Sequence, residues 1–161
     1  MAASGTIINP MEETFKIYVH RLKEGHTETL VETLSPEFMG VSEAELAFKV
    51  PVIVEGEASA SDGALVLRLH LETEATMPCS ICNNDVQVKI SILNLCHTEE
   101  IAQIKGGVFD YQDVVREAIL LELPFIAECN QGDCPERATM AKYISKNQDQ
   151  ENSLWQSHEI G

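Results

Sequence analysis

The sequence predicts an α+β protein in which an antiparallel β-meander, either open or closed into a barrel, is covered by one main helix and carries a cysteine cluster. Three observations predict this class. Three consecutive segments in the middle of the chain alternate apolar and polar residues, which is the period of strands with one buried face. A later segment has the apolar spacing of an amphipathic helix. Finally, four cysteines form two closely spaced pairs.

The strands of the predicted meander are defined by alternation. Their apolar residues are, in order, Leu46, Phe48, Val50, Val52 and Val54; Leu65, Leu67, Leu69 and Leu71; and Val86, Val88, Ile90 and Ile92. Pro51 cannot donate to a sheet ladder, so we expect the first strand to lie at an edge or to bend there. A turn at 61–63 and a tight loop at 77–84 join the strands, which indicates antiparallel neighbours.

Two segments precede the meander. Residues 15–19 alternate apolar and polar side chains, which predicts a further strand. Residues 27–34 are predicted as a short helix, because Leu30, Val31 and Leu34 would then share one side and a Ser-Pro pair follows.

The main helix is predicted between Gly107 and Pro124. Asp110 is placed to act as its N-cap, with Asp113 three residues later. Its apolar face comprises Tyr111, Val114, Val115, Ala118 and Ile119, widened by Leu120, Leu121 and Leu123. A single sheet cannot bury its apolar face alone, so we expect this helix to cover it.

The chain has the length of one domain with polar ends. We expect a flexible lead at 1–13, a single domain over 14–144 and a disordered tail over 145–161. Apolar runs are far shorter than the ~20 residues that span a bilayer, and the start lacks the features of a secretory signal. We therefore expect a cytoplasmic protein with no membrane association.

The charge of the chain bears on its partners. Lys and Arg number 11 against 26 Asp and Glu, which gives a formal net charge of -15. Such a chain lacks the basic surface that binds RNA by neutralising phosphates. A basic partner is favoured instead.

The five cysteines form two pairs and one single residue. Cys79 and Cys82 have C-x2-C spacing between two predicted strands, and Cys129 and Cys134 have C-x4-C spacing after the helix. An odd count without an export signal argues against a disulfide scaffold. If the helix lies back across the sheet, the two pairs meet, and four sulfurs at ~2.3 Å from one ion make a closed tetrahedral zinc site. Such a zinc ion is structural, because no position is left open for water.

Two other interpretations of the cysteines remain open. Cys79 and Cys82 could form a thiol redox or metal-delivery pair, although that role usually sits at the start of a helix. The two pairs could also be unrelated thiols in a plain acidic interaction domain. The fifth cysteine, Cys96, is expected to be a small buried residue, with His97 beside it as a weaker alternative ligand.

Catalytic motifs are missing from the sequence. It contains no G-x-S-x-G nucleophile elbow, no glycine-rich phosphate loop and no H-E-x-x-H pair. The histidines are scattered singly and the many glutamates look like a solvated surface. We therefore expect a protein that is not an enzyme.

The order of the motifs along the chain is informative. It runs through Pro51-Val52-Ile53-Val54-Glu55-Gly56, Leu67-Arg68-Leu69, Met77-Pro78-Cys79-Ser80-Ile81-Cys82, Leu121-Glu122-Leu123-Pro124, and Cys129 with Cys134-Pro135. This order resembles the YceD family, the large-ribosomal-RNA-subunit accumulation proteins of bacteria and chloroplasts, over roughly Phe15 to Pro135. Many relatives continue into a further C-x-x-C-G element, whereas no cysteine follows Cys134 here.

The resemblance implies a non-enzymatic role in ribosome biogenesis. The family supports accumulation of large-subunit ribosomal RNA, and its matching cysteines here are Cys79, Cys82, Cys129 and Cys134. It also suggests a connection to a small zinc-binding protein of the large subunit. Together with the negative charge, this predicts a basic ribosomal protein or large-subunit precursor as partner, with no direct binding of bare RNA.

Overall fold

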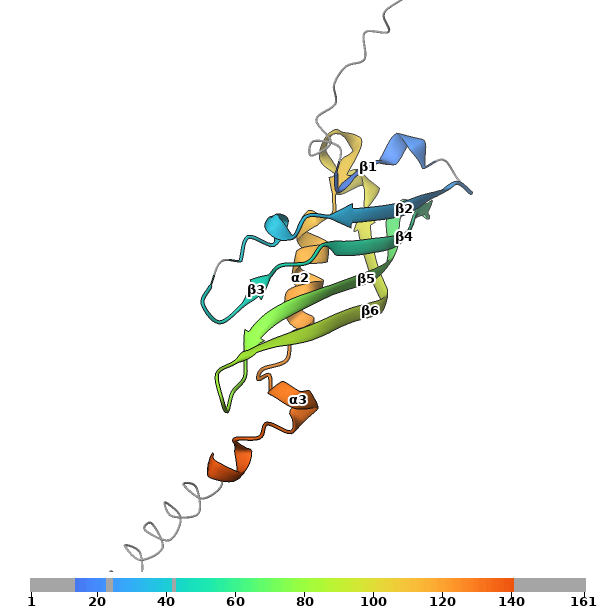
Figure 1. Cartoon of the computed structure of the whole chain (residues 1–161). Helices are drawn as coiled ribbons and strands as arrows, with labels where there is room; N and C mark the ends of the chain where they lie inside the picture. Colours follow the sequence, from blue (N-terminus) through green and yellow to red (C-terminus); the bar gives the residue numbers. More distant parts are fainter. Residues whose placement is uncertain (1–13, 23–24, 42, 141–161) are drawn as a thin grey trace, which may run out of the picture. The chain divides into compact units, whose positions relative to one another are not determined.

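The computed structural model describes residues 14–22, 25–41 and 43–140 (Figure 1). The strands are β1 Lys16–Tyr18, β2 Thr27–Leu34, β3 Ala47–Phe48, β4 Val52–Ser61, β5 Ala64–Pro78, β6 Asp85–Glu100 and β7 Val108–Asp110. The helices are α2 Gln112–Glu122 and α3 Cys129–Gly132, with 3-10 turns η1 Val19–Arg21, η2 Pro36–Met39, η3 Ile101–Gln103 and η4 Lys105–Gly107. The predicted lead at 1–13 and tail at 145–161 lie outside the described residues.

The chain divides into two compact units. Of the described residues, the first unit holds those within 14–41, 48–75 and 89–123. The second unit holds those within 43–47, 76–88 and 124–140. Among the described helices, none has the length and apolar character needed to cross a bilayer.

The first unit is built on an antiparallel sheet. β4 lies between β2 and β5, and β5 also pairs with β3 and β6. The β4–β5 hairpin turns through Asp62 and Gly63, whose positive φ angles of 51° and 78° suit the two-residue turns that match strand twist. The sheet is open and does not close into a barrel (Figure 1). The α+β class and the covered meander predicted from the sequence are thus confirmed.

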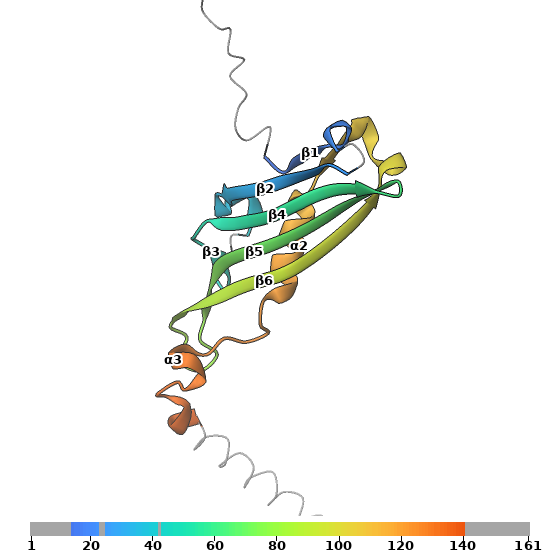
Figure 2. The ribbon, with the colours of Figure 1, turned by 90° about the vertical axis from the view of Figure 1, so that its right-hand side faces the viewer.

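Helix α2 runs across one face of this sheet (Figure 2). Beneath it lie the apolar residues of alternate strand positions, all fully buried or nearly so: Val52, Val54, Ala58, Leu65, Leu67, Leu69 and Leu71. The helix contributes Tyr111, Val115 and Ile119 to the same core, as its spacing predicts. However, Leu121 was expected to widen this face and is instead 77% exposed.

The C-terminal end of α2 follows its predicted signal, whereas the prediction of Asp110 as N-cap is wrong, because the helix begins one residue later and its N-cap is Tyr111. Asp110 Oδ1 still accepts a hydrogen bond from the backbone N–H of Gln112, at 2.9 Å. The helix ends at Glu122, two residues before Pro124. In its middle, Arg116 Nε donates to the carbonyl of Met39 at 2.8 Å, which ties η2 to the helix.

A second small sheet pairs β1 with β7. Ile17 lies opposite Phe109 and is fully buried. The Phe15 ring packs on Phe38 and Tyr111, with centroid distances of 4.8 and 5.3 Å. The strand predicted over 15–19 is therefore present but short, because 3-10 turn η1 begins at 19.

The short helix predicted over 27–34 is wrong, because this segment is strand β2. It pairs with β4 along its whole length, from Thr27 opposite Ser59 to Leu34 opposite Val52. Leu30 and Leu34 are four residues apart, a spacing that fits both a helix face and one side of a strand. Val31, which a helix would have buried with them, is 67% exposed. The β-branched residues at alternate positions are consistent with the strand.

The first strand of the predicted meander is interrupted at its proline. β3 ends at Phe48 and β4 begins at Val52, so Pro51 separates them as the bending alternative predicted. Farther along β4, Gly56 lies opposite Leu69 of β5. A Cβ atom at Gly56 would lie 2.0 Å from the carbonyl oxygen of Arg68, so the two backbones approach as only glycine permits.

Candidate metal centre

The candidate site lies wholly in the second unit and is made by two loops. The first joins β5 to β6 over residues 79–84. The backbone N–H of Cys79 donates to Asn84 at 2.7 Å, and that of Asn83 donates to Cys79 at 2.9 Å. Asn83 has a φ of 66°, the left-handed conformation that asparagine tolerates. This closed turn directs the side chains of a C-x2-C pair to one place.

The second loop begins with α3, a turn rather than a regular helix. Asn130, Gln131 and Gly132 have φ angles of 53°, 55° and 89°, so three successive residues are left-handed. Asn130 Nδ2 donates to the carbonyl of Asp133 at 2.9 Å, and the Asp133 N–H donates back to Asn130 at 3.1 Å. This reversal returns the chain so that the sulfur of Cys134 lies close to that of Cys129.

Backbone contacts hold the two loops together. Cys79 forms an isolated parallel bridge with Ala127. The Ser80 N–H donates to the Ala127 carbonyl at 2.8 Å. Farther along, the Cys129 N–H donates to Cys79 Sγ at 3.3 Å. The convergence of the loops therefore does not rest on the sulfur atoms alone.

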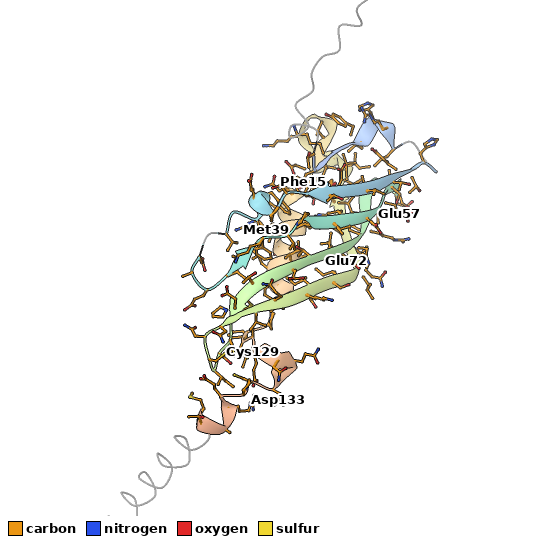
Figure 3. The ribbon with its side chains drawn as sticks, in the orientation of Figure 1. Phe15, Met39, Glu57, Glu72, Cys129 and Asp133 are labelled. Carbon is orange, nitrogen blue, oxygen red and sulfur yellow. The ribbon has the colours of Figure 1, made fainter. Side chains whose placement is uncertain are left out.

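The four sulfur atoms form a compact group. Those of Cys79, Cys82, Cys129 and Cys134 all lie within 4.8 Å of one another, and the Cys82 and Cys129 sulfurs are 3.6 Å apart. Tetrahedral zinc with ~2.3 Å bonds to sulfur would space its ligands by about 3.8 Å. This group could hold a metal ion. The convergence predicted from the sequence is confirmed; Figure 3 labels Cys129 and Asp133 in the second loop.

Exposure differs within the group. Cys79 and Cys134 are each 2% exposed, whereas Cys82 and Cys129 are half-buried. A depression of about 520 Å³ opens over the site and is lined by Cys82, Cys129 and Cys134 together with Asn84 and Asn130. One side of the group is thus accessible to ions from solution.

The protonation of the thiols is set by their neighbours. Backbone N–H groups of Cys82, Cys129 and Ile81 lower the pKa of the Cys79 thiol to about 6, against the opposing effect of burial. The pKa of Cys129 is raised, because its thiol donates to Cys134 and because of burial. Burial also raises the pKa of Cys134. The thiolate form is therefore favoured at Cys79, whereas Cys129 and Cys134 hold protons that a bound cation would displace.

An ion pair that the sequence did not predict closes the second loop. Glu128 Oε1 accepts hydrogen bonds from the Cys134 N–H at 3.1 Å and from Arg137 Nε at 2.8 Å. The paired guanidinium holds the pKa of Glu128 below its usual range. No pattern of sequence spacing predicts that Glu128 will bond both the backbone of Cys134 and the side chain of Arg137, so the sequence offered no signal for this contact.

The fifth cysteine and its neighbour are not part of the group. The prediction that Cys96 is buried is wrong, because its side chain is exposed. In β6 the less exposed side chains lie at even positions up to Ile92 and at odd positions from Leu95 onward, because Leu93 and Asn94 are both exposed. Position 96 therefore falls on the exposed side of the strand. His97 instead contacts Glu99 Oε2 at 3.1 Å and stacks on Phe109. Among the described residues, the only group that could hold a metal ion is that of the four cysteines.

Comparisons with known proteins add no assignment. No family model, no curated protein and no solved structure matches this chain.

Proposed function

We propose that Cys79, Cys82, Cys129 and Cys134 bind one structural zinc ion. The observation that carries this proposal is the approach of all four sulfurs to within 4.8 Å of one another. Four soft thiolate ligands suit zinc, and a complete set leaves no coordination position for water. The expected role of the ion is to fix the two loops, since it joins residues 47 or more positions apart in sequence.

We further propose that the protein is a non-enzymatic factor in large-subunit ribosomal RNA accumulation, as its resemblance to the YceD family implies. Its partner would be a basic ribosomal protein or a large-subunit precursor. The net charge of -15 supports a basic partner, since acidic and basic surfaces attract and bare RNA is repelled. Such binding should weaken steeply as salt rises.

Affinity capture from cells at graded salt, with metal analysis of the same sample, tests both parts. One zinc per chain and recovery of ribosomal proteins that falls with salt would support the proposals. Naked ribosomal RNA without ribosomal protein would refute the partner. Absence of metal after anaerobic purification would refute the zinc site.

A thiol redox or metal-delivery role is the second candidate. It is favoured by the lowered pKa of Cys79, since the thiolate is the reactive form. This role predicts a thiol that alkylates rapidly while the fold and metal content stay intact. A structural zinc site instead predicts that the four thiols are protected until a chelator is added, with Cys96 reacting throughout because it is exposed.

A further inference from the structure

The first unit leaves one face of its sheet uncovered by α2. We call this the open face; its outward side chains include Val31, Ile53, Glu55, Glu57, Glu72 and Leu93. The strand register forms rows across it: Glu57 lies opposite Thr29 and Arg68, and Glu55 lies opposite Val31 and His70. Figure 3 labels Glu57 on β4 and Glu72 on β5.

The open face is hollowed along its strands. One depression of about 670 Å³ is lined by residues of β2, β4, β5 and β6, among them Glu55, Glu57 and Leu93. Another, of about 560 Å³, is lined by Ile53, Glu72 and Glu74 among others. Extended segments of a binding partner could lie in such depressions and contact side chains of several strands.

Apolar side chains lie exposed on this face. Val31 is 67% exposed, Leu93 is 66% exposed and Ile53 is 39% exposed. They come from three different strands of one sheet. A solvated strand face ordinarily carries polar residues at such positions, so these side chains offer contacts for apolar groups of a partner.

Carboxylates outnumber cations around these apolar positions: the two depressions are lined by Glu55, Glu57, Glu72 and Glu74, with Arg68 and Lys89. Glu57 lies 4.0 Å from Arg68, and Glu72 lies 2.9 Å from His70. Glu55 and Glu74 form no ion pair with any residue that the structure describes. Two carboxylates on this face are therefore available to cations from outside the chain.

We propose that the open face binds a basic segment of a partner protein, one that alternates Lys or Arg with apolar residues. The carboxylates of Glu55 and Glu74 would attract the cations, and Val31, Ile53 and Leu93 would contact the apolar side chains. A nucleic acid or an anionic lipid surface would be repelled by the same carboxylates. This inference rests on the proposed function only in that the partner is a basic protein.

The test uses the full chain and a nine-residue peptide of alternating Lys and Ile, followed by backbone NMR titration. We expect shifts in residues of the open face, with none in α2 or the cysteine loops. The double variant Glu55→Lys with Glu74→Lys should bind about tenfold more weakly, because each reversal replaces an attraction by a repulsion. Leu93→Ser should weaken binding several-fold.

Matched controls separate this surface from general attraction to an acidic protein. Glu117→Lys with Glu122→Lys makes the same change in net charge on exposed positions of α2, and Leu121→Ser removes a similarly exposed leucine. These variants should bind the peptide as the original chain does. Equal losses in both charge variants, or shifts confined to other residues, would overturn the inference. So would binding of a 12-nucleotide RNA at the same residues.

The outcomes also separate this inference from the proposed function. If the peptide does not bind the open face but capture at low salt still recovers ribosomal proteins, only the location of the surface is refuted. If the peptide binds there and no ribosomal protein is captured, the open face stands and the role in ribosome assembly falls.

Discussion

Replacing Gly56 by alanine should destabilise the sheet of the first unit. The new Cβ atom would lie 2.0 Å from the Arg68 carbonyl oxygen and 2.9 Å from the Leu69 Cα atom. Ordinary van der Waals contact begins near 3.4 Å, so β4 and β5 would have to separate locally by about 1.4 Å. Both obstructing atoms belong to the backbone and cannot rotate away.

The size of the effect follows from what such a separation breaks. Overpacking of a filled core costs about 1–3 kcal/mol, and each backbone hydrogen bond lost near the site costs about 1 kcal/mol more. We therefore expect a loss of about 3 kcal/mol, which lowers the melting temperature by roughly 6–12 °C for a chain of this size. Since small domains have about 5–15 kcal/mol in total, the variant should still fold.

Urea unfolding of the two proteins measures this difference. Gly63→Ala is the matched control: nothing lies within 4 Å of its added Cβ, so only its φ of 78° is unfavourable, at about 1–2 kcal/mol. A Gly56→Ala variant as stable as the original chain, or more stable than Gly63→Ala, would show that β4 and β5 are not paired in this register. Zinc content should be unchanged in both variants.

Three further predictions concern the cysteine loops. Cys129→Ser should lower the zinc content of the purified protein well below one per chain, whereas Cys96→Ser should leave it unchanged. Glu128→Gln should weaken zinc binding about 10–100-fold in a chelator competition, with Glu117→Gln, at an exposed position of α2, as a neutral control. Folding lowers the pKa of Glu128, so the ionised carboxylate stabilises the folded chain at any pH above its unfolded pKa near 4.3. This stabilisation is lost as the pH falls through the lowered pKa of the folded state. In metal-free protein, the original chain should therefore become as unstable as Glu128→Gln only below that pH. Mild peroxide treatment of metal-free protein should link Cys82 to Cys129, whose sulfurs are 3.6 Å apart and half-buried; mass spectrometry showing a Cys79–Cys134 link instead would contradict this.

Local signals made much of the first unit predictable. Four leucines at alternate positions from Leu65 define β5, the Asp62-Gly63 pair defines the hairpin, and Pro124 sets the end of α2. The segment at 27–34 could not be assigned in the same way. Its two buried leucines fit either period, and the deciding contact is pairing with β4, which begins at Val52, 18 positions after β2 ends at Leu34.

The candidate site was likewise predictable from the sequence only in part. Cysteine spacing predicted which four cysteines converge, because two side chains directed at one ion must sit close together on a turn. The contact between Glu128 and Arg137 depends on how the second loop folds back, which spacing does not encode. The exposure of Cys96 depends on a shift of alternation within β6 at Leu93 and Asn94, and this also lies beyond a fixed two-residue period.

The proposed metal centre and the proposed choice of partner are linked through charge. The formal net charge of -15 counts the cysteines as neutral. Four thiolates bound to one divalent zinc ion carry a net charge of about -2, so the zinc-bound chain is more acidic than its composition indicates. Loss of the ion, with protonation of the thiols, would make the chain less acidic. Metal binding would therefore strengthen, rather than offset, the proposed preference for a basic partner over RNA.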